Sequence, residues 1–202
     1  INSFMKIRNL GGSARGLNDP IYKNYLKILT DENVCMALKN TVIMIVVTLI
    51  GQVGIAIVLA MLVDNIHRGA SFFRIVYFFP IVISATALGV LFNLIFQYDG
   101  GMLSQLVGAK VNWKELYPLT VMMTPVTWQY VGFYFIILVT GLNNIPQELY
   151  ESAAIDGATR WQRIRYISWP MIHNVVCTCA ILAVTGALKV FDLPWVMFPN
   201  GA

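Results

Sequence analysis

Charged residues are scarce in this chain. Only 12% of its 202 residues are Asp, Glu, Lys or Arg, whereas about 25% is usual in a soluble globular domain. Hydrophobic residues make up 57%, and the mean hydropathy is +0.67. These values exclude a disordered chain and an ordinary soluble enzyme. The net charge of +4 is too dilute to indicate nucleic acid as a partner, and it fits basic ends that flank membrane spans.

Cysteine and histidine are also rare. The chain has 3 cysteines, too few for a disulfide framework, and 2 histidines. Cys177 and Cys179 are two positions apart, so on a helix they point to different faces. No usual ligand spacing lets His67 and His173 form a zinc site with these thiols. We interpret the cysteines as small apolar residues, and we expect neither a metal nor another cofactor.

Long apolar runs dominate the sequence instead. A helix rises 1.5 Å per residue, so about 20 apolar residues cross a hydrocarbon core of about 30 Å. Runs of this length predict four membrane helices, at 41–63, 75–97, 116–142 and 171–191. The alternation of period two that marks barrel strands is absent from them. The predicted fold class is therefore all-α, a polytopic membrane helix bundle with four visible spans.

The charges of the connecting segments give one indication of orientation. Segments 64–74 and 143–170 lie on one side of the predicted membrane and carry five Lys or Arg residues. Segments 1–40 and 98–115 lie on the other side and carry eight. The positive-inside rule, taken alone, would place the second pair in the cytoplasm.

The segment 143–170 has strong helix signals. Asn144 is suited to cap a first helix, predicted at 146–156, with Pro146 in its first turn. Gly157 is the expected left-handed stop of this helix.

A second helix is predicted to start directly after this stop. Thr159 and Gln162 can form a capping box, which places the helix at 160–169, with Pro170 as its end. A loop of this kind is usually a solvated connector between spans. Its caps, however, indicate a rigid loop, and small side chains around the turn would let another surface approach closely. These small residues are Ser152, Ala153, Ala154, Gly157 and Ala158.

The spacing of residues in this loop matches a known motif. Glu151-Ser152-Ala153 is followed after three residues by Gly157, and after nine more by Ile167 and Trp169-Pro170. This pattern resembles the EAA motif of binding-protein-dependent ABC importer permeases. The longer run ELYESAAIDGA is similar to the sugar-importer branch related to the maltose and glycerol-phosphate permeases. Ser152 replaces the first Ala of the motif and Trp169 replaces the usual Leu, and both changes keep the helix and the turn.

Other segments carry the same resemblance. The run FFRIVYFFP at 72–80 resembles the entry to a middle span of that branch, and YDGG at 98–101 resembles the external turn that follows. The residues NY at 24–25 and LKNT at 38–41 resemble the approach to an earlier span. The resemblance covers most of 18–197.

The resemblance implies part of the transmembrane domain of a type I ABC importer. Such permeases usually have six or more spans, so further spans are expected on both sides of the four visible ones. Segment 143–170 would be the cytoplasmic coupling loop of a permease domain at 41–202. Segment 1–40 would be external, as would 98–115. This orientation is opposite to the one that the charge count indicates.

The resemblance also implies a function and partners. The chain would be a multi-pass subunit in a bacterial or archaeal inner membrane. It would pass a carbohydrate or related small solute, delivered by an extracytoplasmic solute-binding protein, into the cell. Separate ABC ATPase subunits would supply the energy, and a second permease subunit would complete a heterodimer. The implied ATPase-coupling residues are Glu151, Ser152, Ala153, Asp156, Gly157, Ala158, Arg160 and Pro170.

A secondary carrier or a channel is the alternative function. Such proteins usually have a buried ionisable group or rings of charge, but no Asp, Glu or Arg lies in the predicted spans. The polar side chains of the spans are amides and hydroxyls: Gln52, Asn93, Gln97, Gln129, Asn174, Thr120, Thr124, Thr127 and Thr140.

An enzyme is a third possibility. An intramembrane enzyme would need a nucleophile beside its base, and Ser84 and Ser104 have no His near them in the predicted layout. The chain has no Gly-x-x-x-x-Gly-Lys run, so it is not expected to hydrolyse ATP itself.

The third predicted span has the composition of a solute route. Pro125 interrupts the helix at mid-membrane, a feature that often lines a cavity. Aromatic rings beside an amide can hold a sugar, and the residues concerned are Trp128, Gln129, Tyr130 and Tyr134. Alternatively, these rings pack between helices or lie in the interfacial belt. Near the end of the fourth span, Lys189 and Asp192 are expected to form an ion pair, with a gate as the alternative.

Overall fold

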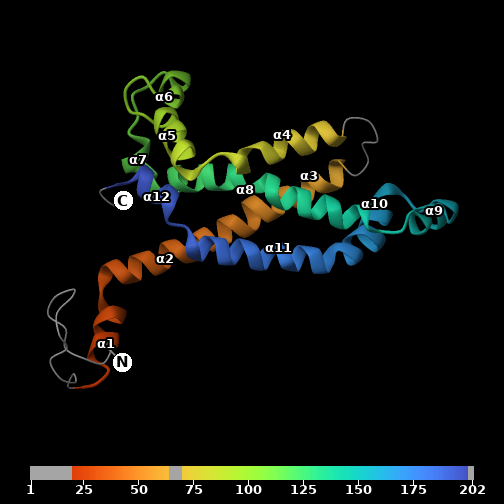
Figure 1. The fold of residues 1–202 in the computed structure, drawn as a ribbon, viewed down its shortest axis with the longest axis horizontal. Helices are drawn as coiled ribbons and strands as arrows, with labels where there is room; N and C mark the ends of the chain where they lie inside the picture. Colours follow the sequence, from red (N-terminus) through yellow and green to blue (C-terminus); the bar gives the residue numbers. More distant parts are fainter. Residues whose placement is uncertain (1–19, 64–69, 200–202) are drawn as a thin grey trace. The chain divides into compact units, whose positions relative to one another are not determined.

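The computed structural model describes residues 20–63 and 70–199, and every regular element in these ranges is a helix (Figure 1). The chain divides into two compact units, Ile1–Ile43 and Met44–Ala202. Position 67, with its histidine, lies outside the described residues, as do positions 1–19. Within the described residues, the all-α prediction is confirmed.

The first unit contains α1, Lys23–Thr30, and most of α2, Glu32–Val47. Asp31 separates the two helices, and its carboxylate accepts a hydrogen bond of 2.9 Å from the backbone N–H of Asn33. α1 buries none of its residues.

The second unit contains the remaining helices. The segment after α2 is the π-helix η2, and the elements follow in this order: η2 Thr48–Gly54, α3 Ile55–Val63, α4 Ala70–Val82, α5 Ala85–Ile95, α6 Met102–Val107, α7 Trp113–Leu116, α8 Pro118–Asn143, α9 Gln147–Ile155, α10 Arg160–Arg163, the π-helix η3 Ile164–Ser168, α11 Trp169–Lys189 and α12 Asp192–Met197.

Three helical stretches of the described chain are long and apolar enough to cross a membrane. They are Glu32–Val63, Pro118–Asn143 and Arg160–Lys189. A fourth span results if Phe72–Val82 and Ala85–Ile95 are counted together, although these helices meet at an angle of 95°. The prediction of membrane helices is confirmed, but the second of them, expected as one helix at 75–97, is broken into two helices.

The bend between α4 and α5 has a local cause. Pro80 lies in the last turn of α4 and has no N–H to donate to the preceding turn. Ser84 then starts a new helix, because its hydroxyl accepts a hydrogen bond of 3.2 Å from the backbone N–H of Ala87. Ile83 therefore lies between the two helices, and the backbone of the next residue, Ser84, is extended.

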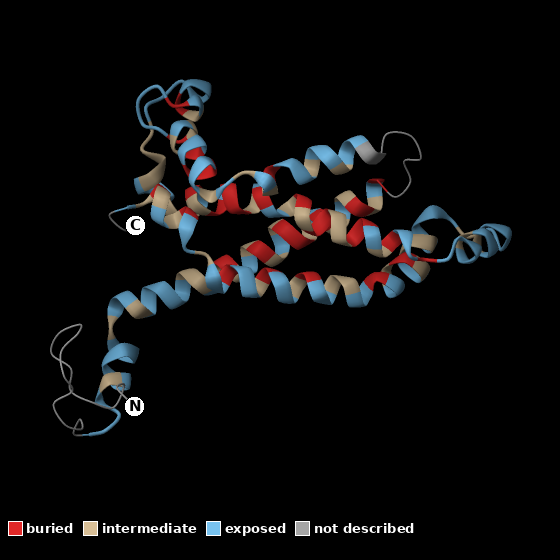
Figure 2. Ribbon diagram, in the orientation of Figure 1, coloured by how far each residue is buried: buried red, intermediate tan, exposed pale blue. Residues whose placement is uncertain are grey.

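Helix α8 is the centre of the second unit. Helices α3, α4 and α11 pack along it, and the buried residues concentrate on the faces that these helices share (Figure 2). Phe135 and Leu138 of α8, Ala56 and Ala60 of α3 and Cys179 of α11 are all fully buried in this core. Cys177 is exposed, which confirms that the two neighbouring cysteines lie on different faces.

The contact between α4 and α8 depends on one glycine. A Cβ atom on Gly132 would overlap the backbone carbonyl of Tyr77. The two helices therefore approach each other more closely at this point than any side chain would allow.

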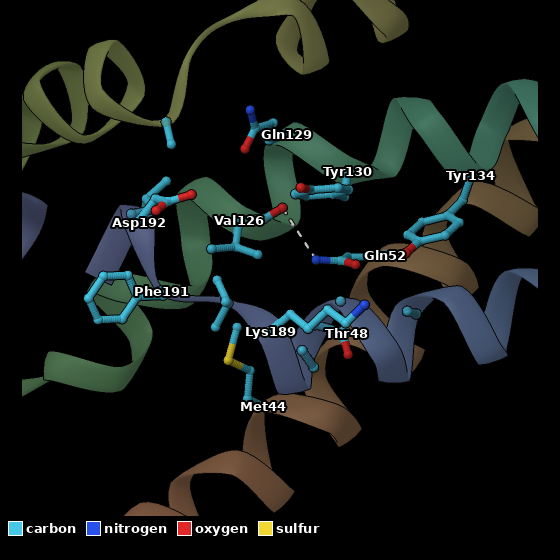
Figure 3. Close-up of a pocket in the computed structure, with 16 residues that line it drawn as sticks. Met44, Thr48, Gln52, Val126, Gln129, Tyr130, Tyr134, Lys189, Phe191 and Asp192 are labelled. Carbon is cyan, nitrogen blue, oxygen red and sulfur yellow. Dashed lines mark hydrogen bonds between the residues drawn. The ribbon is translucent and has the colours of Figure 1, made fainter. Parts of the chain in front are cut away.

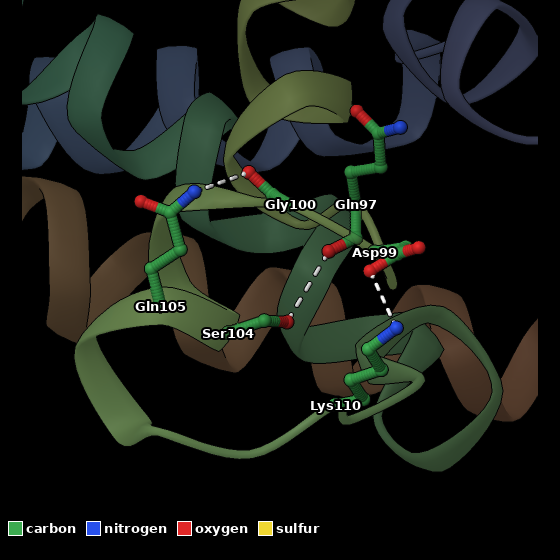
Figure 4. A network of polar contacts seen from close by, with 6 residues as sticks. All are labelled: Gln97, Asp99, Gly100, Ser104, Gln105 and Lys110. Carbon is green, nitrogen blue, oxygen red and sulfur yellow. Dashed lines mark hydrogen bonds and ion pairs between the residues drawn. The ribbon is translucent and has the colours of Figure 1, made fainter.

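The connection between α5 and α8 is held by polar contacts (Figure 4). Gly100 has a φ of 76°, which agrees with the turn that the resemblance implies at 98–101. The hydroxyl of Ser104 donates to the carbonyl of Gln97 over 3.2 Å, and the amide of Gln105 donates to the carbonyl of Gly100 over 3.0 Å. Lys110 pairs with Asp99 at 2.8 Å, and this hydrogen-bonded carboxylate raises the pKa of Lys110.

Candidate functional site

The loop between α8 and α11, for which the EAA resemblance implies ATPase coupling and which we therefore call the coupling loop, turns sharply at Gly157. This residue has a φ of 74°, and its N–H donates to the carbonyl of Ala154 over 3.2 Å. The next N–H, of Ala158, reaches back to the carbonyl of Ala153 over 2.9 Å. These two bonds satisfy carbonyls at the end of α9. The predicted pair of helices with a glycine stop between them is therefore confirmed.

The start of α9 differs from the prediction. Asn144 closes the end of α8, and α9 begins after Pro146 without a side-chain cap. Asn144 does not cap α9 because α8 continues to Asn143. The chain uses residues 144–146 to turn from α8 into α9.

The start of the second helix is as predicted, but its end is not. Thr159 and Gln162 form the capping box, with the Gln162 side chain accepting from the Thr159 N–H at 2.7 Å. Pro170 does not end the helix, because Arg160–Lys189 is one continuous helical stretch. The wider π-helical turn η3 ends at Ser168, two positions before Pro170, and it forms the preceding turn whose backbone the proline ring would otherwise meet.

Most coupling-loop residues are exposed. Glu151, Ser152, Asp156 and Gly157 lie at the surface, and α9 contains no buried residue. Apolar residues are exposed beside them, and sequence reasoning did not identify these: the exposed fraction is 87% for Ile155, 72% for Trp161 and 73% for Tyr166.

One hydrogen bond ties α9 to the helix that leads into the last span. The hydroxyls of Tyr150 and Ser168 lie 2.8 Å apart, and Ser168 is buried. A hollow of about 420 Å³ lies beside this bond, and Glu151, Arg160 and Arg163 line it. Asp156 lines a different hollow together with Gly157.

A second candidate site lies between the spans. It is a cavity of about 300 Å³, which we call the central cavity, formed by η2, α8, α11 and the start of α12 (Figure 3). Three of the four residues predicted for a solute route line it: Gln129, Tyr130 and Tyr134. Its other polar residues are Thr48, Gln52, Lys189 and Asp192.

Trp128 does not join the central cavity. Its ring lies 5.9 Å from that of Phe92, and it lines a separate apolar groove of about 800 Å³ with Tyr77, Thr124 and Thr127. Adjacent residues on a helix are about 100° apart, so Trp128 and Gln129 face different spaces. The alternative interpretation of this ring, that it packs against another helix, applies here.

Two buried glutamines hold the walls of the central cavity together. The amide nitrogen of Gln52 donates to the carbonyl of Val126 over 3.3 Å. The amide nitrogen of Gln129 donates to the carbonyl of Ile83 over 3.0 Å, at the bend between α4 and α5. Gln52 was noted in the sequence only as a polar residue at membrane depth. Its isolation in an apolar run is the signal that could have assigned it to a site.

The charged residues of the central cavity do not pair. Lys189 and Asp192 both line it, but among the described residues the ion pair is that of Lys110 with Asp99. The expected pair of Lys189 with Asp192 is thus wrong, because α11 ends at Lys189 and the chain turns before α12. Figure 3 shows the two side chains extending to different parts of the cavity.

Within residues 20–63 and 70–199, no three His, Cys, Asp or Glu side chains lie close enough together to hold a metal ion.

Similar proteins were found in sequence and in structure. The chain is 30% identical over 190 residues to the probable ABC transporter permease protein YurN of Bacillus subtilis, covering 89% of this chain and 65% of that protein. It is 29% identical over 196 residues to the lactose transport system permease protein LacF of Rhizobium radiobacter, covering 93% and 62%. The chain thus spans about three fifths of the length of such relatives.

A solved structure has the same fold. It is a bacterial ABC transporter involved in the import of the acidic polysaccharide alginate, with a TM-score of 0.75 at 22% identity, covering 82% of this chain and 61% of that one. The family model described as binding-protein-dependent transport system inner membrane component matches residues 52–201. That region includes the end of η2 from Gln52 onward, the cavity-lining parts of α8, α11 and α12, and the whole loop between α8 and α11. On this match the chain belongs to the family of binding-protein-dependent transport system inner membrane components.

Proposed function

We propose that this chain is the membrane-spanning permease subunit of an ATP-driven importer. A solute-binding protein outside the cell delivers a carbohydrate or related small solute. The permease passes that solute across a bacterial or archaeal inner membrane, and a separate ATPase subunit hydrolyses ATP. The observation that carries this proposal is the coupling loop, a helix with no buried residue that turns at Gly157 and whose sequence resembles the EAA pattern.

The exposure of α9 supports the contact with an ATPase. Ile155, at the end of the helix, is 87% exposed, and Gly157 adds no side chain beside it. An apolar side chain next to a flat turn is suited to insert into a groove of another protein. In the proposal, this contact is made by the residues identified from the motif, Glu151, Ser152, Ala153, Asp156, Gly157, Ala158 and Arg160. Pro170 stays within the helix behind them.

The central cavity supports a small hydroxylated solute. Its volume of about 300 Å³ is at the lower end of the range typical of small-molecule sites. Tyr130 and Tyr134 provide ring surfaces, while Gln129 and Gln52 provide amides. The names of relatives agree with this class, since they include permeases for lactose and for diacetylchitobiose. In the proposal, a second, non-identical permease subunit completes the pathway.

The function is tested by copurification and uptake. The permease is expressed with its cellular partners, purified in mild detergent and placed in proteoliposomes. We expect an ATPase subunit, a second permease and a solute-binding protein to copurify, and we expect ATP-dependent uptake of at least one of lactose, diacetylchitobiose and sn-glycerol-3-phosphate. Uptake driven by an ion gradient in the absence of ATP would contradict the proposal.

The proposed orientation places Gly157 in the cytoplasm and 98–115 outside. Thr159→Cys and Gln105→Cys are suitable reporters because both positions are exposed. In intact cells, a membrane-impermeant thiol reagent should modify position 105 and leave position 159 unmodified until the membrane is opened. Labelling of 159 but not of 105 would reverse the assignment and would agree with the charge count instead.

A further inference from the structure

Two glutamine side chains are buried among the membrane helices of the central cavity. The exposed fraction is 2% for Gln52 and 8% for Gln129. A buried amide in an apolar environment is costly unless its polar atoms find partners. Each of these amides has one partner within the described chain, a backbone carbonyl on a different element.

These partners fix which way each amide points. A backbone carbonyl can only accept a hydrogen bond, so the group that faces it must be the amide nitrogen and not the amide oxygen. Gln52 therefore turns its nitrogen to Val126, at 3.3 Å, and Gln129 turns its nitrogen to Ile83, at 3.0 Å. Flipping either amide would place two oxygens against each other and break the bond.

The amide oxygens are consequently held away from these carbonyls. Figure 3 shows the oxygen of Gln52 on the side opposite to Val126, toward Tyr134. Among the described residues, no donor bonds to either oxygen. Neither oxygen belongs to the side-chain atoms that are both fully buried and without a hydrogen-bond partner. Both residues line the central cavity, so two acceptors with fixed positions are open to a molecule inside it.

The partner at Ile83 has a specific origin. Because α4 ends at Val82 and α5 begins at Ala85, Ile83 belongs to neither helix. No backbone N–H is bonded to its carbonyl among the turn and loop bonds of the described chain, which leaves this carbonyl for Gln129. The bend thus orients the Gln129 amide from outside the cavity.

We infer that Gln52 and Gln129 form an acceptor pair that selects solutes by their hydroxyl hydrogens. This inference rests on the proposed function and specifies the chemistry of the solute. A sugar hydroxyl can donate to an amide oxygen, whereas the corresponding methyl ether cannot. The cavity therefore takes a polyhydroxyl compound and rejects the same carbon skeleton once its hydroxyls are methylated.

Binding is measured in the cavity itself, so that the test does not depend on transport. Gly186 lines the central cavity, and a Cβ added there has no atom within 4 Å, so Gly186→Cys is a suitable reporter. Its alkylation is followed by peptide mass spectrometry in the whole chain. The probes are methyl α-glucopyranoside and its fully O-methylated ether. Cys177 is exposed and lies outside the cavity, so it serves as the internal reference.

The glucoside should slow alkylation at position 186 without affecting Cys177, and the methylated ether should leave both rates unchanged. Gln52→Met and Gln129→Met, each combined with the reporter, should raise the half-protecting concentration of the glucoside about fivefold, the effect of losing one hydrogen bond. Gln105→Met is the matched control, since its amide bonds to Gly100 in the segment before α7. It should leave protection unchanged.

Three results would overturn the inference: no protection by the glucoside, equal protection by the ether, or unchanged protection in both methionine variants. Cys179 is fully buried, so the absence of its alkylation verifies that the variants are folded, while Cys177 reports only the reactivity of the reagent. If the inference fails while ATP-dependent uptake and copurification succeed, the proposed function stands without this acceptor pair. If uptake and copurification fail while protection is observed, the cavity binds hydroxyl-rich compounds in a protein with another role.

Discussion

Replacing Gly157 with valine is expected to leave the permease in the membrane and to abolish its coupling to ATP hydrolysis. The residue has a φ of 74°, a conformation that costs a residue with a Cβ about 1 to 2 kcal/mol. No atom lies within 4 Å of an added Cβ, so the effect comes from the backbone and from the surface presented to a partner. A cost of this size changes the population of the turn about 5- to 30-fold.

The expected result is loss of the ATPase in a pull-down, or retention of the ATPase with solute-independent hydrolysis and little uptake. Gly108→Val is the matched control. Gly108 has a φ of 70° and equally open surroundings, but it lies in the segment between α6 and α7. It should carry similar strain and keep the ATPase. Normal binding and transport in Gly157→Val would mean that the loop is only a connector.

Replacing Gly132 with alanine is expected to destabilise the helix bundle itself. The added Cβ would overlap the backbone carbonyl of Tyr77, which cannot move aside like a flexible side chain. Helices α4 and α8 must then separate, and the core around Phe135 opens with them. Overpacking of this kind costs about 3 kcal/mol or more, which lowers the unfolding midpoint by about 6 to 12 °C in a protein of this size.

Thermal unfolding in detergent, followed by tryptophan fluorescence or by aggregation, measures this effect. Gly186→Ala makes the same chemical change within a membrane helix, at a position where nothing lies within 4 Å of the new Cβ. It should raise the midpoint or leave it unchanged, because alanine favours a helix over glycine by about 1 kcal/mol. Equal midpoints for the two variants would show that the close approach of α4 and α8 has no energetic role.

The parts of the fold that could be predicted are those set by local chemistry. The glycine stop at Gly157 and the capping box at Thr159 depend on residues within one turn of each other, and both occur as expected. The positions of the apolar spans follow from run length. The bend at Ile83 was missed because the span was assigned from the length of the apolar run 75–97, and run length takes no account of Pro80 and Ser84, each of which signals a helix end or start.

At Pro170 the sequence predicted a helix end that the structure does not have. A proline at this position normally ends a helix, but the π-helical turn η3 before it keeps Arg160–Lys189 continuous. Whether a helix widens in this way depends on packing around the buried Ser168, which a single sequence does not reveal.

The candidate sites also differ in whether they depend on residues close together in the sequence or on the packing of distant helices. The coupling loop is local, so its residues could be named from their spacing. The central cavity joins η2, α8 and α11, which are far apart in sequence. Only its α8 residues could be named, and one of the four proposed, Trp128, faces another groove. Gln52 and Lys189 needed the packing of the helices to be known before either could be assigned.

The unbroken helix from Arg160 to Lys189 connects the two sites mechanically. Its 30 residues make it about 45 Å long, so a tilt of about 5° moves the far end by about 4 Å. One end lies in the coupling loop beside the bond between Tyr150 and Ser168, and the other places Lys189 in the central cavity. In the proposed function this helix would act as a lever: a small tilt at the end proposed to contact the ATPase would move the end that lines the central cavity by more than the length of a hydrogen bond.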